Sequence, residues 1–193
     1  MTSARDALRR EMRARRRALP APVRIAAAEP LADRLLALPF APRSGFVAGY
    51  WSMDGEIALH AWQVRLPGDV RYCLPVLHED GTLRFAPWTP GAPLTSNRFG
   101  IPEPEVPADA LLPPSALGLA VVPLVAFDAR GHRLGMGGGW YDRSFAFRVA
   151  QSGPPRLVGA GFAVQQADAI AAEPWDIPLD AVCTESDTFL VTA

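Results

Sequence analysis

The sequence predicts an α/β fold, a three-layer sandwich in which helices cover both faces of a largely parallel central sheet. Short apolar runs rich in β-branched residues alternate with helix-like segments, a pattern typical of parallel strands joined by helices. Residues 119–128 are apolar and β-branched enough to form an interior strand. A chain of 193 residues with 49% apolar content can bury one sizeable core, so we expect a single domain over residues 1–193.

The first expected element is a helix over residues 2–18. Thr2 or Ser3 can cap its N-terminus, because a hydroxyl there accepts a hydrogen bond from a free backbone N–H. The helix must end before Pro20. Its apolar side chains are spaced to form a stripe that faces the core, and they are Ala4, Leu8, Met12 and Leu19.

A second helical segment is expected to begin near Pro22 and to be interrupted or kinked at Pro30, since proline lacks the N–H that a helix interior needs. It resumes over residues 31–37. Residues 45–51 then form a strand, Asp54-Gly55 a turn, and residues from Glu56 to about Arg65 a helix.

Strands are expected at residues 70–74 and 83–88, where apolar and aromatic side chains gather. The proline-rich connection over residues 89–117 is unusually long for a compact domain. Such a segment is either a functional lid or disordered.

The chain ends with a helix over residues 140–150, a strand over 156–162, a short helix over 165–171, and strands at 181–183 and 188–191. The last two strands close the sheet.

The glycine-rich stretch from Arg133 to Arg143 is the strongest functional signal. It contains four glycines, two arginines and one aspartate between an interior strand and a helix. Glycine lets backbone N–H groups approach an anion, and a carboxylate just inside the helix can hold Mg²⁺. A plain turn is the competing interpretation, but Arg133 and Asp142 favour a phosphate site. The pattern is neither a Walker A loop nor a dinucleotide fingerprint.

Charge and composition exclude several classes of protein. All 19 basic residues are arginine, so no lysine can act as a nucleophile or bind phosphate. The net charge of −1 gives no general attraction to nucleic acid. No apolar stretch is long enough to span a membrane or to act as a secretory signal. Cys73 and Cys183 are expected to be buried thiols of a reducing compartment, and we expect a cytoplasmic monomer.

The first 24 residues carry eight arginines. Nucleic-acid binding and a transit peptide are two possible interpretations of this density. A solvated face of an amphipathic helix is favoured over both, because Asp6 and Glu11 dilute the charge.

Two further acidic residues are candidates for a site. Glu56 follows a strand end, where ligands of open α/β sheets gather, but it could equally stabilise the first turn of the next helix. Asp176 could begin a turn before Pro178, or could share Mg²⁺ with Asp142 if the fold brings the two together. The three histidines form no ligand cluster in the sequence.

Five blocks in the same order resemble the 5-formyltetrahydrofolate cyclo-ligase family, also called methenyltetrahydrofolate synthetases. The glycine-rich stretch is similar to the family signature R-L-G-x-G-x-G-x-Y-D. The other blocks are Arg5-Asp6-Ala7-Leu8-Arg9, Gly55-Glu56-Ile57, Phe99-Gly100-Ile101-Pro102-Glu103-Pro104, and Asp176-Ile177-Pro178-Leu179-Asp180 with Thr184-Glu185. The resemblance also implies a sheet architecture like that of phosphosugar isomerases and CoA transferases.

The resemblance implies roles for individual residues. ATP would be bound by Arg5, Leu8 and Arg9, and its phosphates by Arg133, Leu134, Gly135, Met136, Gly137, Gly138, Gly139, Trp140 and Tyr141. Mg²⁺ would be bound by Asp142 and Asp176, and the folate by Trp51 and Glu56, with Arg133 and Glu56 taking part in catalysis. The chain departs from the usual pattern with Gly138 for lysine, Met136 and Trp140 for tyrosine, and Trp175 for histidine.

The implied reaction is the ATP- and Mg²⁺-dependent conversion of 5-formyltetrahydrofolate, which can be polyglutamylated, to 5,10-methenyltetrahydrofolate, ADP and phosphate. Two alternatives stay open from the residues alone. One is a phosphosugar isomerase or acyl-CoA transferase on a related sheet. The other is an RNA-binding or regulatory protein that uses its arginine-rich first helix.

Overall fold

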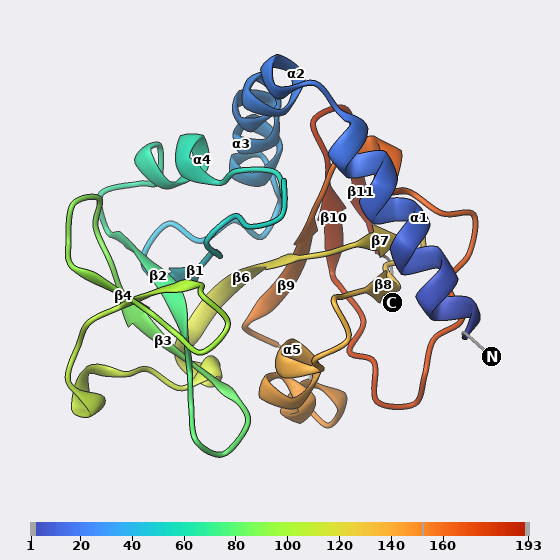
Figure 1. Ribbon diagram of the computed structural model, residues 1–193. Helices are drawn as coiled ribbons and strands as arrows, with labels where there is room; N and C mark the ends of the chain where they lie inside the picture. Colours follow the sequence, from blue (N-terminus) through green and yellow to red (C-terminus); the bar gives the residue numbers. More distant parts are fainter. Residues whose placement is uncertain (1–2, 152, 192–193) are drawn as a thin grey trace.

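A seven-stranded sheet runs through the middle of the molecule in the computed structural model, which describes residues 3–151 and 153–191 (Figure 1). From edge to edge its strands are β11 (Thr188–Leu190), β10 (Ala181–Cys183), β9 (Arg156–Ala160), β6 (Leu117–Pro123), β1 (Gly45–Ala48), β2 (Val70–Leu77) and β3 (Leu83–Pro87). The five inner strands are parallel, and β3 and β11 pair antiparallel at the edges. The predicted largely parallel sheet is confirmed.

Helices pack against both faces of this sheet. They are α3 (Ala28–Leu36) and α4 (His60–Val64) on one face and α5 (Trp140–Ser144) on the other. Successive residues of a strand point to opposite faces. Val121 of β6 therefore packs in one core cluster with Leu31 and Trp62. Val122 packs in the second cluster with Phe145, directly after α5. The predicted α/β fold is confirmed, and Cys73 and Cys183 are buried free thiols.

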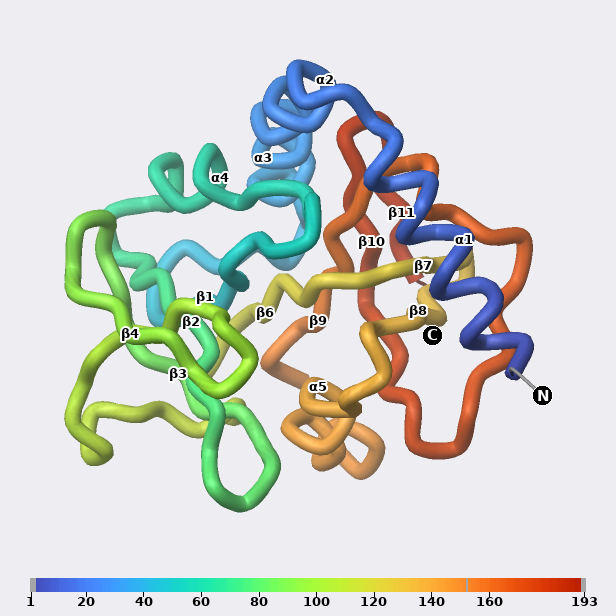
Figure 2. Tube along the Cα trace, viewed as in Figure 1, coloured from blue at the N-terminus to red at the C-terminus, as the bar shows by residue number. Residues whose placement is uncertain are grey.

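The first helix, α1 (Ala4–Ala18), lies beside the small hairpin of β7 (Ala126–Phe127) and β8 (Arg133–Leu134) (Figure 2). Ser3 caps the helix by accepting a hydrogen bond from the Asp6 backbone N–H, whereas Thr2 lies outside the described residues. Met12 of the predicted apolar stripe packs against Leu134 and Val125. This packing fixes α1 against the segment that leads into the glycine-rich stretch.

Asp128 holds the turn between β7 and β8. Its side chain is fully buried, and Oδ1 accepts hydrogen bonds from the backbone N–H groups of Arg130 (3.0 Å) and His132 (3.1 Å). Oδ2 accepts one from Ile170 N (3.0 Å) and contacts His132 Nδ1 at 3.0 Å. Burial alone raises the pKa of this carboxyl, but the hydrogen bonds from Ile170 and His132 outweigh it, and the net pKa lies below the usual value.

We expect Asp128→Asn to lower the free energy of unfolding by about 1–3 kcal/mol, because the amide cannot accept from all of these donors. The melting temperature should fall by about 2–4 °C for each kcal/mol lost. Because the folded-state pKa is lowered, this stability is present at neutral pH and disappears as the pH falls through that pKa. Thermal melts of both proteins between neutral and acidic pH check this. An equal difference in melting temperature at every pH would contradict it.

Three predicted helix boundaries are wrong. The second helical segment breaks at Ala27 between α2 (Ala21–Ala26) and α3, and Pro30 lies in the first turn of α3, where a missing N–H costs nothing. The helix expected from Glu56 to Arg65 is only α4, so Glu56 is not in a helix. The helix expected over 140–150 stops at Ser144 and continues as a 3₁₀ turn over Ala146–Val149.

The short helix expected over residues 165–171 is also wrong. A 3₁₀ turn over Ala163–Gln165 comes first, and residues 166–171 form no helix. Ala167 N donates to Phe127 O at 2.8 Å, and Ile170 N donates to Asp128. Tertiary hydrogen bonds thus replace the helical ones that the alanine-rich sequence would favour.

Two other segments differ from expectation. The strand predicted over 119–128 is divided between β6 and β7, with Leu124 and Val125 between them. The strand predicted over 45–51 stops at Ala48. The connection over 89–117 is ordered, with an antiparallel hairpin of β4 (Leu94–Ser96) and β5 (Pro102–Pro104). Over the described ranges, no helix is both long and apolar enough to cross a membrane.

Candidate active site

A cavity of about 340 Å³ opens where the parallel strands β1 and β6 end. Tyr50 and Trp51 line it just after β1, and Pro123 and Leu124 line it at the end of β6. Ligands of open α/β sheets bind at the carboxyl ends of strands. The volume falls within the range of small-molecule sites.

The glycine-rich stretch forms one wall of this cavity. Gly137 and Gly139 have φ angles of 100° and 64°, which side chains with a Cβ rarely adopt. Arg9 of α1 donates from Nε to Gly135 O at 2.9 Å, and Arg143 donates from Nη1 to Gly138 O at 2.9 Å. Two arginines therefore hold the loop in place from either side, with its backbone exposed to the cavity.

Arg133 lies at the base of the loop and is nearly buried, with 7% of its surface exposed. Its Nη1 donates to Ile177 O at 2.5 Å, and its Nη2 donates to Asp142 Oδ1 at 2.6 Å. The same Oδ1 accepts from Ile177 N at 3.1 Å. In the part of the chain that the structure describes, Asp142 Oδ2 has no hydrogen-bond partner, so this oxygen can serve a cation at the cavity.

Asp176 lines the same cavity. From the sequence, a role for Asp176 depended on the fold bringing it to the same site as Asp142. Arg5 donates from Nη1 to Asp176 Oδ2 at 2.8 Å and from Nη2 to Asp176 Oδ1 at 3.2 Å. The backbone N of Glu173 donates to Asp176 Oδ2 at 2.9 Å. Burial raises the pKa of the Asp176 carboxyl, but Arg5 and Glu173 N outweigh it, and the net pKa lies below the usual value. The carboxylate is therefore ionised at neutral pH.

The two aspartates alone provide too few ligands for a metal ion. Within residues 3–151 and 153–191 no group of three His, Cys, Asp or Glu side chains is placed to hold a metal ion. Two carboxylates that share a cavity fit Mg²⁺ only if phosphate oxygens and water complete its shell, which is how this ion is commonly bound. In the described structure Asp142 Oδ2 is open to such an ion, whereas both oxygens of Asp176 accept from Arg5, so phosphate and water would have to supply most of the ligands.

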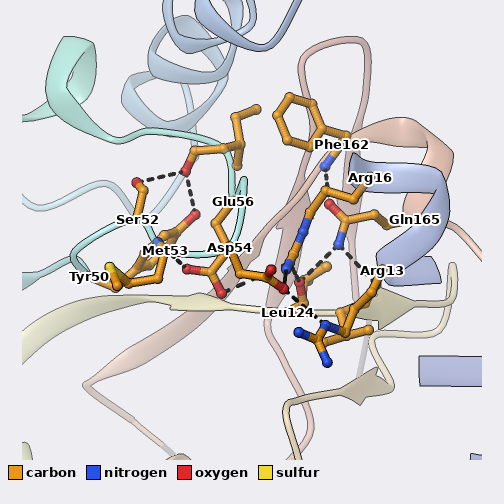
Figure 3. A network of polar contacts seen from close by, with 12 residues as sticks. Arg13, Arg16, Tyr50, Ser52, Met53, Asp54, Glu56, Leu124, Phe162 and Gln165 are labelled. Atoms are coloured by element: carbon orange, nitrogen blue, oxygen red, sulfur yellow. Dashed lines mark hydrogen bonds and ion pairs between the residues drawn. The ribbon is translucent and has the colours of Figure 1, made fainter. Parts of the chain in front are cut away.

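Glu56 lines the cavity from the turn after β1, and 12% of its side chain is exposed. Figure 3 shows it beside Met53 and Arg16. Its Oε2 accepts from Met53 N at 3.0 Å, and its Oε1 lies 3.9 Å from Arg16 Nη1. Burial raises the pKa of Glu56, and the Met53 N–H and Arg16 offset only part of this rise. Trp51 lies nearby and packs edge-on against Trp88, with ring centroids 5.8 Å apart.

The hairpin of β4 and β5 forms another wall of the cavity, and its tip meets the glycine-rich stretch. Phe99 at its tip packs edge-on against Trp140, with ring centroids 6.2 Å apart, and Arg98 lies over both rings. Glu103 holds the hairpin by accepting from Leu77 N and Asn97 Nδ2, both at 2.8 Å. The connection expected to be a lid or disordered is thus an ordered cavity wall.

Most sequence-predicted site residues meet at this cavity. Fourteen line it: Arg5, Arg9, Trp51, Glu56, Arg133, Gly135, Met136, Gly137, Gly138, Gly139, Trp140, Tyr141, Asp142 and Asp176. The other two, Leu8 and Leu134, pack in the apolar cluster behind the loop. Their ATP contacts stay predictions.

Sequence reasoning missed several wall residues. Phe99, Ile101 and Glu103 belong to a quoted block of the resemblance, but no role was assigned to them. Tyr50 was given no role, and Asp54 was expected only as part of a turn. The arginine partners of Asp54 lie 37 to 41 residues away in the chain, so no local pattern indicates them.

Comparisons with known proteins identify the family. The family model for the 5-formyltetrahydrofolate cyclo-ligase family matches residues 1–185. The chain is 38% identical over 178 residues to the 5-formyltetrahydrofolate cyclo-ligase of Escherichia coli (strain K12), covering 91% of this chain and 97% of that one. It is 40% identical over 136 residues to the enzyme of the same name from Haemophilus influenzae, covering 69% and 72%.

A solved structure supports the same assignment. The 5,10-methenyltetrahydrofolate synthetase of Aquifex aeolicus superposes with a TM-score of 0.82 at 27% identity, covering 99% of this chain and 94% of that one. The family match spans nearly the whole chain, and the glycine-rich stretch, Glu56 and Asp176 all lie at one cavity. The chain is therefore an enzyme of the 5-formyltetrahydrofolate cyclo-ligase family.

Proposed function

We propose that this enzyme converts 5-formyltetrahydrofolate to 5,10-methenyltetrahydrofolate at the expense of ATP, releasing ADP and phosphate. The observation that carries the proposal is the set of residues that line this one cavity. A glycine-rich loop with arginines lies on one side, and a buried glutamate with an aromatic neighbour, Glu56 and Trp51, lies on the other. This arrangement suits a nucleotide and a flat heterocycle bound side by side.

The chemistry explains why ATP is needed. The N-formyl group is an amide, so its carbon is a poor electrophile and its oxygen a poor leaving group. If the formyl oxygen attacks the γ-phosphorus, ADP leaves and the oxygen becomes part of a phosphate ester. N10 then attacks the formyl carbon and loses its proton, and phosphate departs to leave the methenyl bridge.

The residues supply position and charge, and no covalent nucleophile is required. Arg5, Arg9 and Arg133 would neutralise the phosphates, and the loop backbone would orient them. Asp142 and Asp176 would hold Mg²⁺, which when bound supplies further positive charge to the phosphates. Glu56 would hold the pterin or N10 region, with Trp51 as an apolar wall. The monomeric state and cytoplasmic location stay predictions.

The direct test is a spectroscopic assay of the purified protein. Methenyltetrahydrofolate should form from 5-formyltetrahydrofolate only when ATP and Mg²⁺ are both present, and its near-UV absorbance follows the product. No product with all three present would refute the proposal. Turnover of a phosphosugar or an acyl-CoA without ATP would instead support the alternative enzymes.

We expect Glu56→Gln to weaken folate binding or slow ring closure, because it removes the charge but keeps the size and hydrogen-bonding atoms of the side chain. The binding free energy of ATP should change by less than about 1 kcal/mol, since sites without shared partners are nearly independent. Titrating ATP and folate separately into both proteins checks this. A large loss of ATP affinity would place Glu56 in the phosphate or metal shell.

A pH profile adds a second readout. Because burial raises the pKa of Glu56, its ionised form should be lost on acidification earlier than for an ordinary glutamate. Wild-type folate binding should therefore weaken as the pH falls through this raised pKa, and Glu56→Gln should lack that limb of the profile.

A further inference from the structure

Arg16 of α1 is completely buried, although the sequence places it among arginines expected on a solvated face. It continues the stripe one turn beyond Met12, where an apolar residue would be expected. Its guanidinium points at the turn that carries Glu56 (Figure 3). Nη2 donates to Asp54 Oδ2 at 2.7 Å, and Nη1 lies 3.9 Å from Glu56 Oε1 and donates to Leu124 O at 3.4 Å.

A buried arginine contributes little net stability to a fold, because its charge must be removed from water. Removing a guanidinium from water costs several kcal/mol, and a well-packed apolar side chain of similar size is often at least as stabilising. The hydrogen bonds here are incomplete, because Arg16 Nε has no partner within the described ranges. The charge of Arg16 therefore calls for an explanation other than stability.

The turn that Arg16 grips has an unusual backbone. Asp54 has a φ of 53°, in the left-handed region that non-glycine residues rarely adopt. Glu56 N donates to Met53 O at 2.9 Å, which closes the turn and aims the Glu56 carboxylate at the cavity. Contacts to Asp54 must hold this strained conformation.

Three arginines of α1 contact Asp54, and among the described ion pairs only Arg16 also pairs with Glu56. Arg13 donates to Asp54 Oδ2 at 2.9 Å, and Arg17 donates from Nε to Oδ1 at 2.7 Å. Arg17 is 55% exposed and Arg16 is fully buried, so the two offer a matched comparison on one carboxylate.

The far side of Arg16 is also fixed. Leu124 O, which accepts from Arg16, accepts from Gln165 Nε2 at 2.9 Å as well. Gln165 is itself buried, and its Oε1 accepts from Phe162 N at 2.9 Å. Arg16 is thus held between the end of β6 and the Glu56 turn.

We propose that Arg16 is a positioning residue for the folate subsite, which fixes the Asp54–Glu56 turn and keeps the Glu56 carboxylate ionised at the cavity wall. This inference rests on the proposed folate role of Glu56. The other groups that face Glu56 are Arg13 from α1, Asp54 on its own turn, the buried Tyr50 after β1 and the partly buried Tyr141 in α5. Among these groups, Arg16 and Arg13 favour the ionised form.

The test compares Arg16→Met with Arg17→Gln in the full-length enzyme. Arg16→Met should raise the KM for 5-formyltetrahydrofolate roughly tenfold or more, because contacts to a charged group are worth about 1.5–3 kcal/mol. The KM for ATP should change by less than about threefold, since the nucleotide wall shares no partner with Arg16. Arg17→Gln should leave both values near wild type.

Two further readouts separate positioning from a general loss of structure. The acidic limb of folate binding should move to higher pH in Arg16→Met, because Glu56 loses its closest cation and its pKa rises further. In a Glu56→Gln background, Arg16→Met should add little to the KM for folate, since the group it positions is already changed. Arg16→Lys should restore part of the affinity and the wild-type pH limb.

Each outcome bears on a definite claim. If Arg16→Met matches Arg17→Gln in the KM for folate and in pH profile, Arg16 is not a positioning residue. Fully additive effects with Glu56→Gln, or equal losses of ATP and folate affinity, would also overturn the inference. If Arg16→Met does not fold, Arg16→Lys alone decides. A raised KM for folate with an unchanged KM for ATP would support the proposal, and a wild-type KM for folate in a protein of lower melting temperature would refute it. A wild-type enzyme without folate turnover would instead refute the proposed function.

Discussion

Arg133→Lys should lower kcat/KM roughly 10²-fold, although the substitution keeps the positive charge. The nearly buried guanidinium bridges Asp142 Oδ1 at 2.6 Å and Ile177 O at 2.5 Å. A lysine ammonium is a point charge that cannot hold two acceptors in the same planar geometry. The glycine-rich loop and the Asp142 carboxylate would both lose their position, and the phosphates would lose a forked cation.

Arg148→Lys is the matched control for this experiment. Arg148 bridges an aspartate and a carbonyl in the same way, with Nη2 on Asp180 at 2.8 Å and Nη1 on Pro178 O at 3.4 Å, but it does not line the cavity. We expect both variants to lose stability and only Arg133→Lys to lose turnover. Melting temperatures and steady-state kinetics on both proteins check this. Wild-type kinetics for Arg133→Lys would contradict a role for Arg133 that requires two hydrogen-bonded acceptors.

Asp142→Asn should lower kcat by roughly 10²-fold or more, the effect of removing one preorganised charge that stabilises the transition state. The amide can still accept from Ile177 N, so the helix start should stay in place. It cannot neutralise Arg133, and its oxygen is a far weaker ligand for a divalent cation. The Mg²⁺ concentration for half-maximal activity should therefore rise.

Asp180→Asn serves as the control, because Asp180 accepts from Arg148 and Arg156 away from the cavity. It should destabilise the protein without changing the Mg²⁺ dependence of the rate. Titrating Mg²⁺ at saturating ATP and folate measures the difference. A near-normal rate for Asp142→Asn at saturating Mg²⁺ would rule out Asp142 as a metal ligand.

Local sequence patterns predicted the elements whose causes are local. The apolar runs at 70–74 and 83–88 became strands, and Ser3 became a helix cap. Each depends on side chains within a few residues, so periodicity and capping rules apply directly. The resemblance added an expected role for Glu56, for which local chemistry had left two interpretations open.

The errors arose where distant partners overrode local preference. Residues 165–171 have a helical composition, but Ala167 and Ile170 donate their N–H groups to Phe127 and Asp128 instead. Glu56 lies before α4, because the turn at Asp54 is held by arginines 37 to 41 residues away in the chain. Rules based on the spacing of side chains along the chain cannot predict such contacts.

The sequence by itself determined the α/β class, the largely parallel sheet and the glycine-rich loop, because these follow from hydrophobic patterning and from the backbone freedom of glycine. Only the tertiary structure decided that Asp142 and Asp176 line one cavity, and that Arg16 is buried against the Glu56 turn. A side chain's charge state and partners depend on what the fold packs around it, and burial changes the strength of every charge interaction. Those surroundings come from strands and helices far apart in the chain.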